Sequence, residues 1–433
     1  MTHRHPILAF VAAVALAVSP ARGQEPPAAF ATWTKIEASE EMRDFLGKLK
    51  TGEFDDDARQ FLETGILRQL AAEKNRPTIE RVRRRLREFV LGERDTEAAA
   101  LEKANAAAAA ALVAMACDAE ADLIVRVNAM LLVGELVGKD GKPWPGAVES
   151  LVTTAADPQL DMGVRVAAIA GLARRGGGAT PALGAETAPK LLAIVSAPVG
   201  NDGAGGDWLV SRALEILPAA MPTATPAAAA ALLALLEDDG RSIDVRVRAA
   251  ATLGLTVNAE AAVDVPRALA TIRTVATDAL ATDLTAAEDR LLGRELSGQP
   301  TGGMPPQFGM GAEAAAAPAA TTPVEPLVVR RDAWRLATLG DAVGSADGTK
   351  GLVTVLPAAG KPAATRLAAT LRDWAAALGQ SPDAATLKQA IAALTKAAPP
   401  AAATPPATVA PPVPADEPAS TPPADDIFST PGN

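Results

Sequence analysis

Side chains able to catalyse a reaction or bind a metal are few in this chain. Both histidines, His3 and His5, lie in the first five residues, and the sequence has one cysteine, Cys117, and no tyrosine. Once residues 1–23 are removed as an export signal, no histidine remains as a base or as a ligand for zinc or iron. We therefore expect no catalytic residue, no cofactor and no metal, and predict that the protein is not an enzyme.

Four other features that could do chemistry have a plainer interpretation. Cys117 is expected to be a small buried residue at a helix end, the alternatives being a reactive thiol or an intermolecular disulfide. Asp55–Asp57 is interpreted as a helix start rather than a metal site. The Asn201–Asp207 loop offers too few oxygens for calcium. Gly344–Lys350 lacks the spacing of a phosphate-binding loop, so both segments are expected to connect helices.

Two features are candidates for contact with a partner. The densest basic run lies between residues 81 and 87, where Arg83, Arg84, Arg85 and Arg87 form a candidate anion-binding patch. The alternative is a solvated helix face, with Glu80 and Glu88 each four residues from Arg84. Trp144 stands between two prolines and is a candidate exposed anchor. Trp208 and Trp334 lie within helical patterns and are expected in the core.

The elements that must position these residues are indicated by a recurring cassette, Val-Arg-x-x-Ala. Its arginines are separated by 39, 81 and 84 residues, which gives a period of 39 to 42 residues if two copies have decayed. A fixed period of this size is typical of stacked helical repeats. The first three copies also carry an aspartate eight residues before the arginine. The cassette residues are Asp118, Arg126, Ala129, Asp157, Arg165, Ala168, Asp238, Arg246 and Ala249, with Arg330 and Ala333 in the fourth copy.

With its Asp, Val, Arg and Ala positions and a Leu-Gly pair as in Leu253-Gly254, the cassette resembles the HEAT repeat, most closely the short HEAT-like variety of bacteria. The resemblance covers about residues 118–345 and implies an all-α fold, an α-solenoid of stacked antiparallel helix pairs with a concave surface for partners. It implies no particular activity.

The cassette also predicts how neighbouring helices are held together. Its small alanines should let adjacent helices approach closely. The aspartate should accept backbone N–H groups at the start of the helix, where four donors lack partners. The arginine should reach an aspartate of its own unit or of the next, which would form a ladder of Asp–Arg ion pairs along the stack.

The whole chain divides by composition and periodicity. Residues 297–326 and 398–433 bury too little apolar surface to offset the entropy of ordering, so they are expected to be a disordered loop and a disordered Pro-rich tail. We expect a signal peptide at 1–23, an extended lead-in at 24–36, an N-terminal helical region at 37–117, HEAT-like repeats at 118–296, a disordered loop at 297–326, C-terminal repeats and helices at 327–397 and a disordered tail at 398–433.

Residues 1–23 have the pattern of an export signal. A short basic start is followed by an apolar run at 7–18, which is too short to span a bilayer, and by Ala21-Arg22-Gly23. Cleavage before Gln24 is expected, an uncleaved anchor being the alternative, and no later membrane span is expected. The chain would then act in the periplasm or outside the cell.

Charge and fold together limit the function classes. The formal charge of −10 becomes −12 when Arg4 and Arg22 leave with the signal, which argues against nucleic acid as a partner. We expect a non-enzymatic scaffold that binds a protein or peptide. The alternatives are a structural or assembly component of the cell envelope and, more remotely, a hydrolase using only carboxylates, for which no Asp/Glu pair is evident. The oligomeric state is left open.

Overall fold

The computed structural model describes residues 35–36, 38–90, 95–174, 183–184, 186–198, 203–296, 324–381 and 383–397. Within these ranges the chain is all-α, and an isolated bridge joins Val137 and Pro143. The expected export signal, most of the lead-in, nearly all of the 297–326 loop and the 398–433 tail lie outside the described residues.

The N-terminal region is helical but irregular. Its elements are α3 (Glu40–Thr51), α4 (Asp56–Gln60), the π-helix η1 (Phe61–Ile66), the 3-10 helices η2 (Leu67–Leu70) and η3 (Glu73–Thr78), α5 (Ile79–Arg85), the π-helix η4 (Leu86–Val90) and α6 (Ala98–Cys117). The helical spacing of residues 56–73 predicts one apolar face, of which four residues are buried and the fifth, Phe61, is half-buried: Phe61, Leu62, Ile66, Leu67 and Leu70. Thr78 stands where the sequence predicts a cap for α5, but its hydroxyl donates backwards to the carbonyl of Asn75 and does not cap the helix.

The sequence predicts helices at 123–137, 146–156, 162–174, 186–196, 227–236, 327–343, 361–379 and 382–397, and the structure has a helix close to each of these ranges. The remaining elements follow in chain order. They are α7 (Leu123–Glu135), η5 (Pro145–Ala147), α8 (Val148–Ala156), α9 (Met162–Ala173), α10 (Thr187–Val195), α11 (Gly203–Ala220), α12 (Pro226–Glu237), α13 (Ile243–Thr256), η7 (Ala259–Ala261), α14 (Val265–Leu296), α15 (Pro326–Val343), η8 (Leu352–Val355), α16 (Lys361–Gln380) and α17 (Ala384–Lys396).

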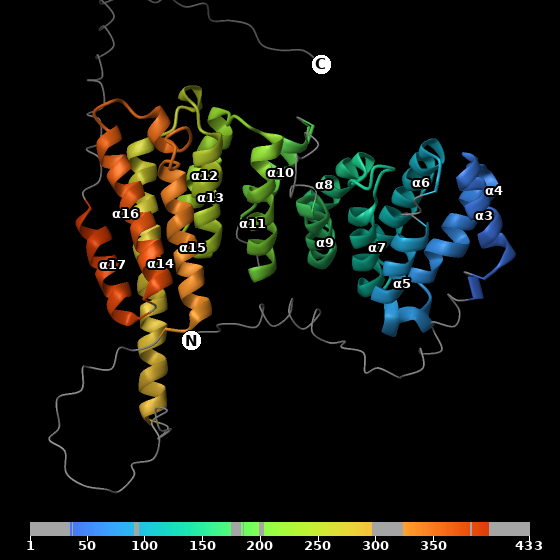
Figure 1. Cartoon of the computed structure of the whole chain (residues 1–433), viewed down its shortest axis with the longest axis horizontal. Helices are drawn as coiled ribbons and strands as arrows, with labels where there is room; N and C mark the ends of the chain where they lie inside the picture. Colours follow the sequence, from blue (N-terminus) through green and yellow to red (C-terminus); the bar gives the residue numbers. More distant parts are fainter. Residues whose placement is uncertain are drawn as a thin grey trace, which may run out of the picture.

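The helices are arranged in two rows along the long axis of the molecule (Figure 1). In one row α5, α7, α9, α11, α13 and α15 pack each against the next, and in the other α8, α10, α12 and α14 do the same. Each of α7, α9, α11 and α13 also packs against the helix directly before it in the chain. An open row in which each helix contacts only near neighbours is consistent with the α-solenoid class.

The repeat pattern predicts, weakly, a further short unit near 284–296, whereas the structure has one 32-residue helix, α14 (Val265–Leu296). The sequence between Arg267 and Leu292 contains neither glycine nor proline, so nothing interrupts the helix there. The carboxylate of Asp264 starts α14 by accepting the backbone N–H of Arg267 at 3.1 Å. The long helix gives α15 and α17 a common support.

Glycines set the closest contacts within the first row. A Cβ added to Gly134 of α7 would lie 2.6 Å from the Cα of Gly171 of α9, which no side chain tolerates. A Cβ on Gly254 of α13 would overlap the backbone of Ala342 of α15. Because Gly134 and Gly254 both stand eight residues after a cassette arginine, the glycine of the cassette is a helix-contact residue.

Candidate functional site

The cassette arginines of the first three copies have one shared role. Each donates its Nε–H to the backbone carbonyl ten residues earlier: Arg126 to Ala116 at 3.0 Å, Arg165 to Ala155 at 3.1 Å and Arg246 to Leu236 at 2.9 Å. These carbonyls lie at the C-terminal ends of α6, α8 and α12, where helix carbonyls lack partners and the helix dipole is negative. The arginines therefore fasten one helix to the end of the one before it.

The cassette aspartates stabilise turns. Asp118, Asp157 and Asp238 each accept the N–H two residues on, at 3.0, 2.9 and 2.9 Å. The expected ladder of Asp–Arg pairs is wrong in its main feature, because the arginines reach backbone carbonyls. Among the residues that the structure describes, Arg246 alone of these three arginines has a carboxylate in ion-pair range, that of Asp239 at 3.0 Å.

The N-cap residues of the following helices are Asp122, Asp161 and Ser242, so the cassette aspartates are not at the positions expected. Asp122 and Asp161 accept the backbone N–H two residues on, at the helix start. The cassette alanines Ala129, Ala168 and Ala249 are fully buried, as their small size predicts.

The fourth cassette copy is not equivalent to the others. Arg330 is exposed and Ala333 is only half-buried, so the interpretation of this copy as a fourth structural arginine is wrong. The buried arginine of α15 is instead Arg335, with 6% of its surface exposed. The helix α15 is therefore rotated relative to the cassette pattern. The sequence similarity at residues 329–333 does not predict which arginine of this helix is buried.

The basic run on α5 and η4 does not act as one patch. Arg83 is largely buried and donates to Oδ1 of Asn128 at 2.9 Å, with Glu135 at 3.5 Å, and burial lowers its pKa. It therefore fastens α5 to α7 and is no partner-binding residue. Arg84 pairs with Glu80 at 3.4 Å, as expected, while Glu88 pairs with Arg87 at 3.6 Å.

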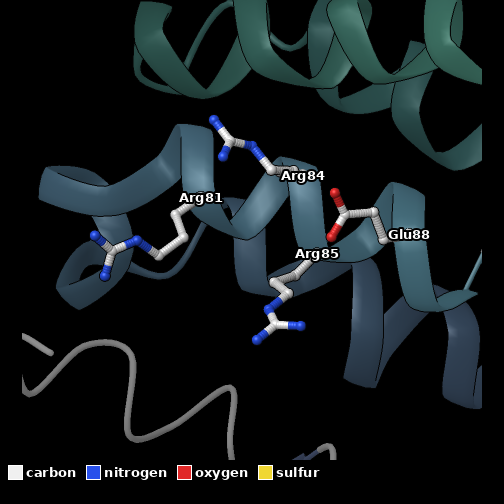
Figure 2. A pocket seen from close by; sticks show the side chains of 4 residues that line it. All are labelled: Arg81, Arg84, Arg85 and Glu88. Carbon is white, nitrogen blue, oxygen red and sulfur yellow. The ribbon is translucent and has the colours of Figure 1, made fainter. Parts of the chain in front are cut away.

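A shallow surface pocket lies over the same helix (Figure 2) and is lined by Arg81, Arg84, Arg85 and Glu88. The three guanidinium groups point in different directions from the helix (Figure 2). An anion in this pocket would be met by one arginine at a time, which is a weak arrangement for phosphate or carboxylate.

Trp144 is not the exposed anchor that its Pro-Trp-Pro context suggested. The residue is 5% exposed, and its indole Nε1–H donates to Oε2 of Glu102 on α6 at 2.7 Å. The bridge between Val137 and Pro143 folds the loop back, and the backbone N–H of Trp144 donates to Leu136. The ring is thereby packed into the core and is not available to a partner.

Two smaller expectations have opposite outcomes. Asp55 caps α4 by accepting the N–H of Ala58 at 2.8 Å, which confirms a helix start in this acidic run. Cys117 is the last residue of α6, as expected, but it is exposed rather than buried. Partial desolvation, followed by the charge of Asp157, raises the pKa of its thiol and so disfavours the reactive thiolate.

A surface that no sequence pattern indicates crosses α11, α13 and α15. The guanidinium of Arg212 lies 5.1 Å from the centre of the Trp208 ring, and that of Arg248 lies 5.0 Å from the Trp334 ring. Glu215 joins the two pairs, accepting from Arg212 at 2.6 Å and also from Arg248. We call these five residues the Trp–Arg strip.

The strip is accessible to solvent at its α15 end. Trp334 is 37% exposed, where the sequence pattern predicted a core position, and Trp208 is half-buried. Leu327 and Leu255 are 68% and 49% exposed, and each lies seven residues along the same helix from a strip residue, hence on the same helix face. Apolar side chains therefore flank the paired aromatic and cationic groups.

The charges of the strip are unequal. Two arginines share the single carboxylate of Glu215, so the strip carries one excess positive charge in an otherwise acidic chain. Burial, and then repulsion by Arg212, lowers the pKa of Arg248 to about 10, so it remains protonated at neutral pH. A ligand carboxylate placed here would relieve that repulsion.

A partly buried cluster of charges, in which Asp283, Asp332 and Arg335 are buried and Asp244 and Arg331 are half-exposed, lies next to the strip and joins α13, α14 and α15. Arg335 donates to Asp283 and to Asp332, each at 3.0 Å, and to Asp244 at 2.7 Å. Arg331 donates to both oxygens of Asp283 at 2.7 and 2.8 Å. Three carboxylates and two arginines leave one carboxylate charge unbalanced.

The cluster keeps a proton near neutral pH. Burial of the fully enclosed Asp332, together with the neighbouring Asp283 carboxylate, raises the pKa of Asp332 to about 8. Its Oδ2 is buried without a partner, which fits a protonated oxygen facing a second carboxylate. Since Asp244 and Arg335 lie within one helical turn of Arg248 and Trp334, the cluster fixes α13 against α15 beneath the strip.

The comparisons with known proteins add no identity. A scan of the chain against protein-family models gives no match, and neither the search of curated proteins nor that of solved structures returns one.

Two further properties bear on the class of site. In the described ranges no group of three or more His, Cys, Asp or Glu side chains is arranged to hold a metal ion. Helix α6 is long and apolar enough to cross a membrane, although no span after residue 23 was expected. Ala100, Ala104, Ala108 and Leu112 of this helix are buried, and it packs against α7, which favours a core helix.

Proposed function

We propose that this protein is an exported, non-enzymatic scaffold that binds a protein or peptide on an array of HEAT-like repeats. Support for the repeat comes from three arginines that make the same contact ten residues back, in helices of equivalent position. The glycines that follow two of these arginines by eight residues also sit at equivalent helix contacts. The sequence pattern of residues 1–23, which is that of an export signal, supports action outside the cytoplasm.

The observation that carries the binding function is the Trp–Arg strip. Tryptophan and arginine are the residues most enriched where partners bind tightly, and here two such pairs lie on adjacent helices with exposed leucines beside them. The helices beneath are joined by ion pairs of the buried Arg335, with the buried Asp283 and the half-exposed Asp244, so the surface is preorganised and a partner would not have to order it.

The hydrolase alternative gains no support from the paired carboxylates Asp283 and Asp332. A glycosidase needs one raised and one ordinary carboxyl group facing a substrate cleft. Both of these groups are buried and held by Arg335, so neither faces solvent or a substrate. Their role is to join helices.

A capture experiment with matched variants tests the proposal. The purified full chain and its Trp334→Ala and Arg212→Ala variants are incubated with an envelope extract, beside an Arg84→Ala control that alters an exposed arginine outside the strip. We expect a partner that is retained by the wild type and the control and lost by both strip variants, with unchanged thermal melting. Equal retention by all four proteins would refute the strip as the binding surface, and recovery of the protein alone would favour the structural alternative.

A further inference from the structure

We propose that the Trp–Arg strip is occupied by the C-terminal tail of the same chain, through the segment Pro422–Phe428. This inference rests on the proposed function of the strip and names a ligand for it. The segment reads Pro-Pro-Ala-Asp-Asp-Ile-Phe and joins the three properties that the strip calls for: prolines, carboxylates and large apolar side chains.

Charge is the first argument. The strip carries two guanidinium groups, Arg212 and Arg248, that share one carboxylate. Residues 398–433 contain no lysine or arginine and four acidic residues, and two of these are the adjacent Asp425 and Asp426. The tail segment therefore supplies the carboxylates that the strip lacks. Because the whole chain is negatively charged, an acidic segment has no general attraction to its surface, and the strip is a local exception.

Shape and polarity form the second argument. Proline-rich segments prefer an extended, preordered backbone and dock on surfaces formed by aromatic side chains, because proline rings pack flat against indole rings. Trp334 presents such a ring at 37% exposure, with Leu327 and Leu255 beside the strip to contact apolar groups. Ile427 and Phe428 follow the two aspartates directly and provide those groups.

Reach is the third argument. The tail leaves the array at Ala397, whose carbonyl accepts a hydrogen bond from Arg273 of α14. The 24 residues from 398 to 421 would span about 75 Å at roughly 3.1 Å per residue. Helix α17 packs on α14, and α14 packs on α15. These two steps cover about 16–20 Å at about 8–10 Å each, and with the distance along α15 added the strip lies within about 40 Å of Ala397.

Tethering makes even a weak contact effective. A tether long enough to reach its site gives an effective concentration of about 1 mM. A segment that bound in trans with a dissociation constant of about 100 µM would then occupy the strip about 90% of the time. An external partner would have to displace the tail, and the tail would set the affinity threshold for binding.

The experiment uses the full chain with a fluorophore that tryptophan quenches on contact. Cys117→Ser removes the exposed native thiol, and Ser429→Cys places a bimane label beside Phe428. We expect the label to be quenched at least threefold relative to the labelled chain in denaturant. The quenching should be independent of protein concentration and should fall in 0.5 M salt.

Variants separate a specific contact from a general one. Trp208→Phe with Trp334→Phe removes both indole quenchers of the strip, and Asp425→Asn with Asp426→Asn removes the two charges of the segment without touching the folded array. Both should restore most of the fluorescence, whereas Trp144→Phe, in a buried ring, should not. Quenching that persists in either of the first two variants would overturn the proposal, and quenching that disappears on dilution would assign the strip to the tail of a second copy. Failure here with retained strip-dependent partner capture would leave the proposed function standing.

Discussion

The shared role of the cassette arginines gives the sharpest test of the fold. Arg165 is 8% exposed and donates to the Ala155 carbonyl at 3.1 Å, whereas Arg330 has the same place in the sequence cassette and is exposed. We predict that Arg165→Met, which keeps most of the apolar stem, lowers the free energy of unfolding and that Arg330→Met does not.

The magnitude follows from the contact that is lost. A hydrogen bond to a charged donor contributes about 1.5–3 kcal/mol, and leaving a buried carbonyl without a partner costs about 1–3 kcal/mol. These two figures describe the same loss, so Arg165→Met should cost about 2–3 kcal/mol. An exposed substitution such as Arg330→Met should stay within about 0.5 kcal/mol.

Urea denaturation followed by circular dichroism at 222 nm measures both variants against the wild type. The transition of Arg165→Met should move to lower urea, while that of Arg330→Met should overlay the wild type. Arg126→Met, at a half-buried arginine with the same bond, should fall between them. Equal shifts for Arg165→Met and Arg330→Met would refute the assignment, because they would mean that the cassette and not the buried contact determines stability.

The cluster of charges, the glycine contact and the buried tryptophan yield three further predictions. Because the pKa of Asp332 is raised from 3.8 to about 8, the folded chain holds a proton that the unfolded chain releases. Stability should therefore fall between pH 4 and 8, by up to about 1.4 kcal/mol per pH unit, and Asp332→Asn should abolish that fall in denaturation series at several pH values. Gly254→Ala should lower the melting temperature markedly, whereas Gly379→Ala, where a Cβ meets nothing within 4 Å, should not. Trp144→Phe should cost about 1–2 kcal/mol, because the hydrogen bond from the buried indole to the exposed Glu102 carboxylate is lost, and an unchanged denaturation midpoint would contradict the bond.

The helices were predictable because their signals are local. The cassette, the caps and the apolar spacing act within one or two turns, and the observed α9 and α12 begin and end within a residue or two of the expected bounds. The single helix α14 was misjudged because a weak match to the repeat outweighed the absence of any helix-breaking residue.

The candidate site was less predictable because its residues meet across helices. Trp334 and Arg248 are 86 positions apart, and only the rotation of α13 and α15 decides that they face each other. For Trp144 the error is the reverse: an exposed side chain was predicted and a buried one is found. The flanking prolines indicate a loop, but they do not indicate that the indole will donate to the Glu102 carboxylate on another helix. The arginines were expected to pair with aspartates because a backbone carbonyl acceptor is present at every residue, so the sequence does not indicate which carbonyl an arginine will contact.

The most direct test of the account is photo-crosslinking at the strip in intact cells. A photo-reactive phenylalanine analogue replaces Trp334 in the full chain, and a matched chain carries it in place of the exposed Arg84. We predict a specific adduct at position 334, identified by mass spectrometry as a partner or as the tail segment Pro422–Phe428, and none at position 84. Absence of an adduct at 334, or the same adducts at both positions, would contradict the assignment of the Trp–Arg strip as the binding surface.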